Sequence, residues 1–500
     1  MTVAAPGLPA VDAARPDVAW RPLSALAAAV ALLLATVAGG YGYHRDELYF
    51  LRAGRELAFG YVDQPPLTPL VARLMDALAP GSLVALRLPS ALAAAAVVVL
   101  TGLLARELGG GRGAQLLAAG TMAVSAILFA VGHLLSTSTW DLLAWTALSW
   151  LVVRALRDGG PSWLAVGAVA GVALENKTLP AFLLAGLLLG VLCVGPRPAL
   201  RSRWPWLGAL LAAALWAPNV AWQVANGLPQ LELSRAIAAG GSGTSDPWYL
   251  FLPMQLVLIS PVLVPVWVLG WWRLARDPAL RTWRAFAVAY VVLAVVFLLT
   301  GGKSYYLTGL YPVLLAAGAA PVVAWVRLGR ARTWLLGAGL ALSLLINTTL
   351  FLPLVPVGRL ADTPVPDVDY DAGETVGWPA FAATVAGVRA DLPADERVVV
   401  LTGNYGEAGA VDRYLPELAP AYSGHNSYWS WGPPPEDVPT VISVGIPAEE
   451  LGRWFGSVTA ASTIDNGVDL DNDEQGRTVW VATDRQVPWT ELWPELRRLG

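Results

Sequence analysis

Residues 30–50 read VALLLATVAGGYGYHRDELYF, and this is the most informative stretch of the chain. An apolar run ends in glycines and is followed at once by a charged tract that contains Arg45, Asp46 and Glu47. Ionisable residues beside hydrocarbon are energetically expensive, so they need a cause, either anchoring at the membrane surface or a site. We therefore expect a membrane helix with a site at its mouth, in a loop that continues through residues 60–67, GYVDQPPL.

The composition is that of a polytopic membrane protein. The chain has 500 residues, of which 56% are hydrophobic and 14% charged, and its mean hydropathy is +0.54. These values are too apolar for a soluble protein of this length. The single cysteine, Cys193, excludes an intramolecular disulfide. Membrane lipids are expected partners, and nucleic acid is not.

Charge divides the chain into two parts. Residues 1–361 hold 25 lysines and arginines against 14 acidic residues, and residues 362–500 hold 8 against 23. A basic membrane part and an acidic tail are physically different, so we predict a transmembrane domain over 22–355 and a separate domain over 362–500. Residues 1–21 are interpreted as a cytoplasmic leader.

Apolar runs of the length needed to cross a hydrocarbon core of about 30 Å recur along the membrane part. They predict eleven spans, near residues 22–41, 83–105, 114–132, 140–156, 163–175, 178–195, 204–222, 248–270, 284–300, 306–326 and 333–354.

Arginine clusters mark alternate loops, around residues 106–112, 154–157, 197–203, 273–284 and 327–332. By the positive-inside rule these loops are cytoplasmic. The first outer loop, residues 42–82, the loop over 223–247 and the C-terminal domain then face outward, in a multi-pass protein of the cell membrane. Within the first loop we expect two interfacial helices, near 45–58 and 69–79, separated by Pro65 and Pro66.

The tail is predicted to be a small α/β domain. Residues 397–401, 440–444 and 478–482 read as strands, and residues 374–390, 448–455 and 489–499 as helices. The turn at 402–406 has a strand-loop-helix context that can bind anions. Residues 423–431, which include His425 and Asn426, suit contact with a sugar or headgroup or packing against the membrane domain.

Lysine is rare, with two residues against 31 arginines. Lys177 and Lys303 both fall on the outer side, where an ammonium group either neutralises a phosphate as a point charge or simply snorkels to the membrane interface. Asp141 supplies a further acid at the outer end of the fourth span; a helix N-terminus also favours such a residue for structural reasons alone.

No cofactor follows from the residues. The three histidines, His44, His133 and His425, have no metal-ligand spacing. A divalent metal ion bound by Asp46 or Glu47 stays open.

Four features together resemble a known family. They are the acidic pair after the first span, Tyr-x-x-x-Pro-Pro-Leu at residues 61–67, the lysine in residues 175–178, and residues 303–312 with their Lys-Ser-Tyr-Tyr start. Roughly residues 20–355 resemble the family 39 glycosyltransferases, which are dolichyl-phosphate-mannose protein mannosyltransferase-like membrane enzymes, with relatives among aminoarabinose and bacterial RgtA-like transferases. The eukaryotic members have inserted lumenal repeats that this chain lacks.

The resemblance implies a GT-C fold and inverting transfer of a sugar from a polyprenyl-phosphate donor to a hydroxyl acceptor, of protein, glycan or lipid class, on the outer face. It implies Asp46 as the catalytic acid residue, with Glu47 beside it and Asp141 at the second acidic position. Residues implied to surround the donor phosphate are Lys177, Lys303, Tyr305, Tyr306 and Arg45. Candidate substrate-binding residues are Tyr61, Asp63, Gln64, His425 and Asn426.

Two other classes fit the hydrophobic pattern. A polytopic transporter or lipid flippase with an extracytoplasmic binding domain would have the same hydropathy, although transporters often contain symmetry-related repeats and charges deep within spans. A sensory or structural membrane protein would bind its partner through the acidic tail alone. Neither would need Asp46.

Overall fold

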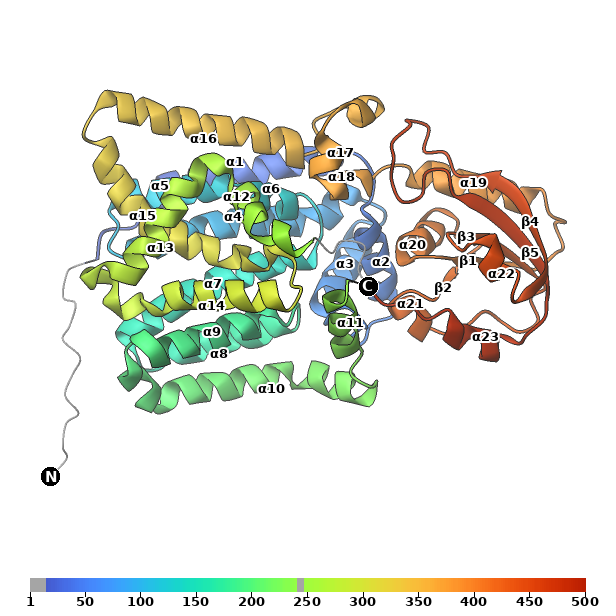
Figure 1. Ribbon diagram of the computed structural model, residues 1–500, viewed down its shortest axis with the longest axis horizontal. Helices are drawn as coiled ribbons and strands as arrows, with labels where there is room; N and C mark the ends of the chain where they lie inside the picture. Colours follow the sequence, from blue (N-terminus) through green and yellow to red (C-terminus); the bar gives the residue numbers. More distant parts are fainter. Residues whose placement is uncertain (1–14, 241–246) are drawn as a thin grey trace.

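The computed structural model describes residues 15–240 and 247–500. Figure 1 shows long helices running side by side along the long axis, with a small sheet domain at one end of the bundle. Helices α2, α3 and α11 lie between the two parts, on the side of the C-terminal domain. Residues 1–14 of the expected leader lie outside the described residues.

Each of the eleven predicted apolar runs is helical. The bundle consists of α1 (Trp20–Val37), α4 (Leu83–Glu107), α5 (Arg112–Ala123), α6 (Ala126–Gly132), α7 (Thr137–Asp158), α8 (Ser162–Leu174), α9 (Leu179–Val194), α10 (Arg203–Ala225), α12 (Phe251–Ile259), α13 (Val264–Arg276), α14 (Ala285–Leu299), α15 (Tyr311–Val326) and α16 (Arg330–Phe351). Short 3₁₀ segments occur at η1 (Arg197–Arg201), η2 (Trp248–Leu250), η3 (Pro261–Leu263), η4 (Pro278–Trp283) and η5 (Ser304–Leu310).

Length and hydropathy mark five helical segments of the described chain as able to cross a membrane: α1, α4, α10, η5 with α15, and α16. Two bent pairs, α5 with α6 at 58° and α12 with α13 at 82°, bring the number to seven. Helices α8, α9 and α14 are apolar but shorter. The chain is therefore a multi-pass membrane protein, and the number of eleven spans stays a prediction.

Small residues allow the bundle helices to approach closely. A Cβ atom added to Gly167 on α8 would lie 2.1 Å from the carbonyl oxygen of Gly208 on α10. Without side chains in the way, the two backbones pack directly, as is common between membrane helices. This contact fixes α8, whose C-terminal end leads to Lys177.

The loop over residues 42–82 folds as expected into two short helices, α2 (Arg45–Arg55) and α3 (Leu67–Leu78). The loop that follows α10 contains α11 (Pro229–Ala238), which the sequence did not predict. That these loops face outward stays a prediction. After α16 the chain forms η6 (Val357–Asp362), α17 (Val365–Val368) and α18 (Tyr370–Gly373), which lie between the bundle and the sheet domain (Figure 1).

The C-terminal domain is built on a five-stranded mixed sheet of order β2-β1-β3-β5-β4. Strand β1 is parallel to β2 and β3, and β5 is antiparallel to β3 and β4. The strands are β1 (Val398–Thr402), β2 (Tyr422–Ser423), β3 (Thr440–Val444), β4 (Phe455–Thr463) and β5 (Thr478–Arg485); the helices are α19 (Trp378–Ala390), α20 (Tyr405–Tyr414), α21 (Ser427–Ser430), α22 (Ala448–Leu451) and α23 (Trp489–Glu495). The predicted α/β class is confirmed, and β4 is a strand that the sequence analysis missed.

The expected anion site at residues 402–406 is already filled by the chain itself. The backbone N–H groups of Gly403 and Asn404 donate to Glu407 Oε2 at 2.9 and 3.1 Å, and Asn404 Oδ1 accepts the N–H of Glu407. This capping box occupies the amides that would otherwise bind an external anion. The turn therefore serves to start α20.

Candidate active site

Asp46 lies in the first turn of α2, which a capping box begins. His44 Nδ1 accepts the backbone N–H of Asp46 at 3.1 Å, and Glu47 Oε2 accepts the N–H of His44 at 2.9 Å. Both bonds satisfy amides that have no partner inside the helix. The positive end of the helix dipole also favours acidic residues at this position. The local sequence thus holds Asp46 at a defined place at the start of α2.

Glu47 is fully buried and bound on both oxygens. Arg87 of α4 donates from Nε to Oε1 at 2.9 Å and from Nη2 to Oε2 at 2.8 Å, and the N–H of Leu135 donates to Oε1 at 2.9 Å. Burial opposes ionisation, but Arg87 holds the pKa of Glu47 below its usual value. The expectation that Glu47 takes part in the chemistry or binds a metal is therefore corrected, because its oxygens join α2 to α4.

Asp46 is directed instead toward the C-terminal domain. Its Oδ1 accepts a hydrogen bond of 2.7 Å from the hydroxyl of Tyr405, the first residue of α20. Its neighbour Arg45 pairs with Glu374 at 3.2 Å and with Asp473 at 3.1 Å. Arg45 does not line the cavity described next and is already paired with these two carboxylates, so its expected role at the donor phosphate stays a prediction.

A cavity of about 330 Å³ lies between the loop over residues 42–82, α9, α11 and the end of α14. It brings together three residues singled out from the sequence, Asp63, Lys177 and Tyr306. The other lining residues are Pro65, Thr178, Leu179, Phe182, Gln230, Leu233, Ser234, Arg235, Ile237, Ala238, Phe297, Thr300, Gly301 and Gly302. A mostly apolar wall with a few cationic and polar groups suits an amphiphilic ligand that carries negative charge.

Lys177 is held by aromatic rings. Its ammonium group lies 5.1 Å from the ring centre of Tyr305 and 5.5 Å from that of Tyr306, within the range of cation–π attraction. It also donates to Ser138 Oγ at 3.3 Å. Asp141, in the second turn of α7, is close enough for its charge to interact with Lys177, although it does not line the cavity.

Lys303 lies in the connection between α14 and η5. Burial, with the positive charge of nearby Lys177, lowers the pKa of Lys303 to about 8, and the charge of Asp46 acts in the opposite direction. The two rare lysines are thus electrostatic neighbours, and Asp46 belongs to the same group. That both bind the donor phosphate stays a prediction.

Asp63 is the second carboxylate of this region. The hydroxyl of Tyr49 donates to its Oδ1 at 2.6 Å. Burial, supported by the negative charge of Asp46, raises the pKa of Asp63 to about 7. Asp46 therefore lies just beyond the cavity, close enough to influence a carboxyl group that lines it.

The remaining candidates separate into two groups. Tyr61 is buried and donates its hydroxyl hydrogen to the carbonyl of Ala53, which holds the end of α2, and Asn426 accepts the N–H of Gly500. Both are structural contacts. Gln64 is 3% exposed, and neither polar atom of its amide has a partner among the described residues. His425 stacks on Tyr405 with ring centres 4.7 Å apart, and burial lowers its pKa to about 4.

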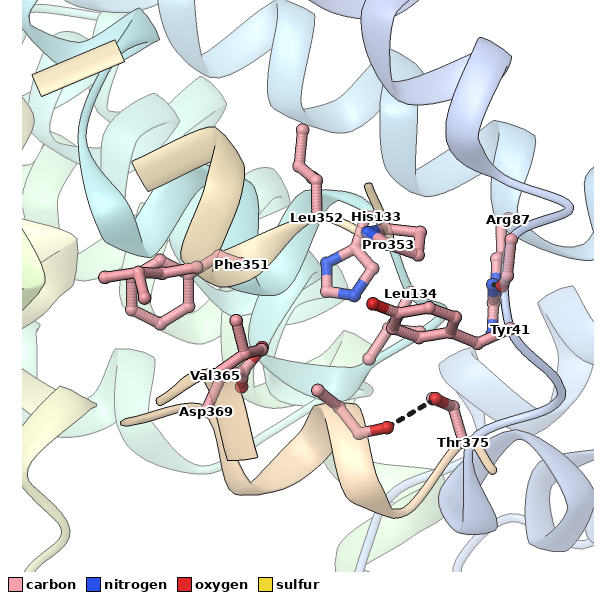
Figure 2. A pocket seen from close by; sticks show the side chains of 13 residues that line it. Tyr41, Arg87, His133, Leu134, Phe351, Leu352, Pro353, Val365, Asp369 and Thr375 are labelled. Atoms are coloured by element: carbon pink, nitrogen blue, oxygen red, sulfur yellow. Dashed lines mark hydrogen bonds between the residues drawn. The ribbon is translucent and has the colours of Figure 1, made fainter. Parts of the chain in front are cut away.

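A second, much smaller pocket lies between the end of α16, residues 365–375 and the start of the loop over residues 40–82. Figure 2 shows it lined by Tyr41, Arg87, His133, Asp369 and Thr375 among others. Its volume of about 10 Å³ is that of one water molecule, so it cannot hold a sugar.

Metal ligands do not gather in the part of the chain that the structure describes. No group of three or more His, Cys, Asp or Glu residues within 15–240 and 247–500 is arranged to hold an ion. With Glu47 committed to Arg87, Asp46 is the one remaining member of the expected pair.

Part of the sequence matches a known family, and the whole fold resembles solved membrane glycosyltransferases. Residues 63–222 match the family described as dolichyl-phosphate-mannose-protein mannosyltransferase, which confirms the predicted resemblance. None of the curated proteins matches the sequence.

Three solved structures show the same fold. ArnT from Cupriavidus metallidurans bound to undecaprenyl phosphate is 15% identical, with a TM-score of 0.60 over 93% of this chain and 98% of that one. Its apo form gives 0.55 at 15% identity, over 91% and 97%. The arabinofuranosyltransferase AftD from Mycobacteria gives 0.51 at 17% identity, over 94% of this chain and 40% of that one. At these identities the likeness establishes the GT-C fold.

Proposed function

We propose that the protein is an inverting glycosyltransferase that moves a sugar from a polyprenyl-phosphate donor to a hydroxyl acceptor at the outer face of the cell membrane. The observation that carries the proposal is the cavity in which Lys177 and Asp63 meet an apolar wall at the end of the bundle. The family matched by residues 63–222 and the ArnT fold support it.

The donor would enter the cavity from the lipid. Leu179, Phe182 and Phe297 offer apolar surface to the polyprenyl chain. The ammonium groups of Lys177 and Lys303 would attract the phosphate, and Arg235 on α11 adds a third cation to the region. Cations fixed near the leaving group stabilise the charge that develops there.

Transfer then needs one displacement. The acceptor hydroxyl gives its proton to the carboxylate of Asp46, and its oxygen attacks the anomeric carbon from the side opposite the phosphate. The bond between that carbon and the phosphate oxygen breaks, and its electron pair stays on the polyprenyl phosphate. The configuration at the anomeric carbon is inverted.

The test is transfer of radiolabelled sugar from synthetic polyprenyl-phosphate donors in membranes that contain the protein. Label should move to lipid, glycan or protein with wild-type protein and not with Asp46→Asn. Movement of donor across the bilayer without any Asp46-dependent transfer would favour a flippase instead.

A further inference from the structure

The C-terminal domain touches the proposed catalytic carboxylate directly, and this contact is the basis of the inference. The hydroxyl of Tyr405 donates to Asp46 Oδ1 at 2.7 Å, across 359 positions of sequence. The backbone amide of Asp46 is meanwhile bound by His44 Nδ1. The residue is therefore held at two points, one within its own helix and one from a different domain.

Tyr405 has little freedom to move away. Its ring lies 4.9 Å from that of Tyr49 and 4.7 Å from that of His425, and the guanidinium of Arg45 lies 5.4 Å from its centre. Closely packed, tilted rings and an overlying cation restrict the side-chain torsions. The hydroxyl is thereby directed to one oxygen of Asp46.

Two glycines set how closely α20 approaches α2. A Cβ atom on Gly406 would lie 2.8 Å from Cβ of Arg45, and one on Gly409 would lie 2.8 Å from Cβ of Leu48. Any larger residue at either position would push the helices apart. The distance between Tyr405 and Asp46 thus depends on the interface between α20 and α2, where the two backbones are nearly in contact.

We infer that Tyr405 is a positioning residue for Asp46, so that the C-terminal domain completes the active site of the membrane domain. The inference rests on the proposed function. By holding Oδ1, Tyr405 orients Oδ2 toward the hydroxyl of the acceptor, which loses its proton there. Donor binding in the cavity of Lys177 does not involve this contact.

The test compares Tyr405→Phe with Tyr370→Phe in the full-length protein, with kcat and donor KM measured separately. Tyr370 is a matched control, because it lies at the same interface between the domains. Its hydroxyl donates to Asp473 and accepts from Arg45, and it does not bind Asp46. A hydrogen bond to a charged group implies a loss of about tenfold to a hundredfold in kcat for Tyr405→Phe. Donor KM should stay the same, and Tyr370→Phe should keep wild-type kcat.

A second variant tests whether the position of the Tyr405 hydroxyl matters, and not only its presence. Gly406→Val keeps Tyr405 but forces α20 away from α2, and it should lower kcat in the same way without changing donor KM. Unchanged kcat in Tyr405→Phe, in protein that loses activity on Asp46→Asn, would overturn the inference and leave the proposed function intact. Wild-type protein that transfers no sugar would instead remove the proposed function itself.

Discussion

Arg87 on α4 binds Glu47 on α2 through two parallel hydrogen bonds of 2.9 and 2.8 Å. Nη1 of Arg87 also donates to the carbonyls of Ala38 and Gly40, and Nη2 donates to the carbonyl of Gly42. The side chains of Glu47 and Arg87 are 0% and 1% exposed, so no water replaces a lost partner. The acidic pair of the first loop is therefore divided, with one carboxylate structural and the other directed to the site.

Removal of one partner of this pair should destabilise the protein. Glu47→Ala leaves the Arg87 charge buried without compensation, which costs about 3–5 kcal/mol in comparable pairs. Thermal unfolding in detergent should show the loss, and the double variant Glu47→Leu with Arg87→Met should recover much of it. Equal stability of Glu47→Ala and wild type would contradict the structural role.

Replacement of Lys177 should weaken donor binding. Lys177→Met removes a charge from the wall of the cavity, so donor KM should rise by about tenfold or more while kcat changes less. Lys177→Arg keeps the charge and should retain most of the affinity. The account of the cavity is wrong if Lys177→Met binds donor as tightly as wild type.

Asp63 should make donor binding depend on pH. Burial raises the pKa of Asp63 to about 7, so the carboxyl group is neutral below that pH and negative above it. A negative charge in the cavity repels the donor phosphate, and donor KM should therefore rise between about pH 6 and about pH 8. Asp63→Asn should remove this rise, as KM measurements across the range would reveal.

The raised pKa of Asp63 also predicts how stability depends on pH, which thermal unfolding at two pH values would measure. A carboxyl group whose folded pKa is raised stabilises the fold at low pH, and that stability is lost as pH rises to the folded value. Asp63→Asn should consequently gain stability relative to wild type at about pH 8 compared with about pH 5. An equal difference at both values would argue against the raised pKa.

Loss of the Lys303 charge should raise donor KM further at pH values above that of the Asp63 titration. Burial and Lys177 lower the pKa of Lys303 to about 8, so its charge is present below that pH and lost above it. Lys303→Arg keeps a charged group at every pH of the assay, because guanidinium does not deprotonate there. Its donor KM should rise less above about pH 8 than that of wild type. Superimposable profiles would exclude Lys303 from phosphate binding.

The helical bundle could be predicted because each membrane segment carries its own apolar signal. The strand β4 could not, since FGSVTAAST is short of large apolar residues and lies mostly exposed at the edge of the sheet. Helix α11 was also missed, although Pro229 at its first turn after Gly227 is a helix-start signal.

Within the site, the sequence identified residue types better than their partners. Asp46, Asp63, Lys177 and Tyr306 were singled out from local motifs. The roles of Glu47 and Arg45 depend on Arg87, Glu374 and Asp473, which lie 40 or more positions away, so no local pattern could assign them. The contact of Tyr405 with Asp46 likewise appears only when the two domains are docked.

The most direct test of the account is sugar transfer by Asp46→Asn beside Glu56→Gln. Glu56 follows the last turn of the same helix and is paired with Arg52 on the surface, so it controls for a changed charge on α2. The account predicts no transfer by Asp46→Asn, wild-type transfer by Glu56→Gln, and equal thermal stability of the two. Transfer by folded Asp46→Asn at the wild-type rate would contradict the central claim.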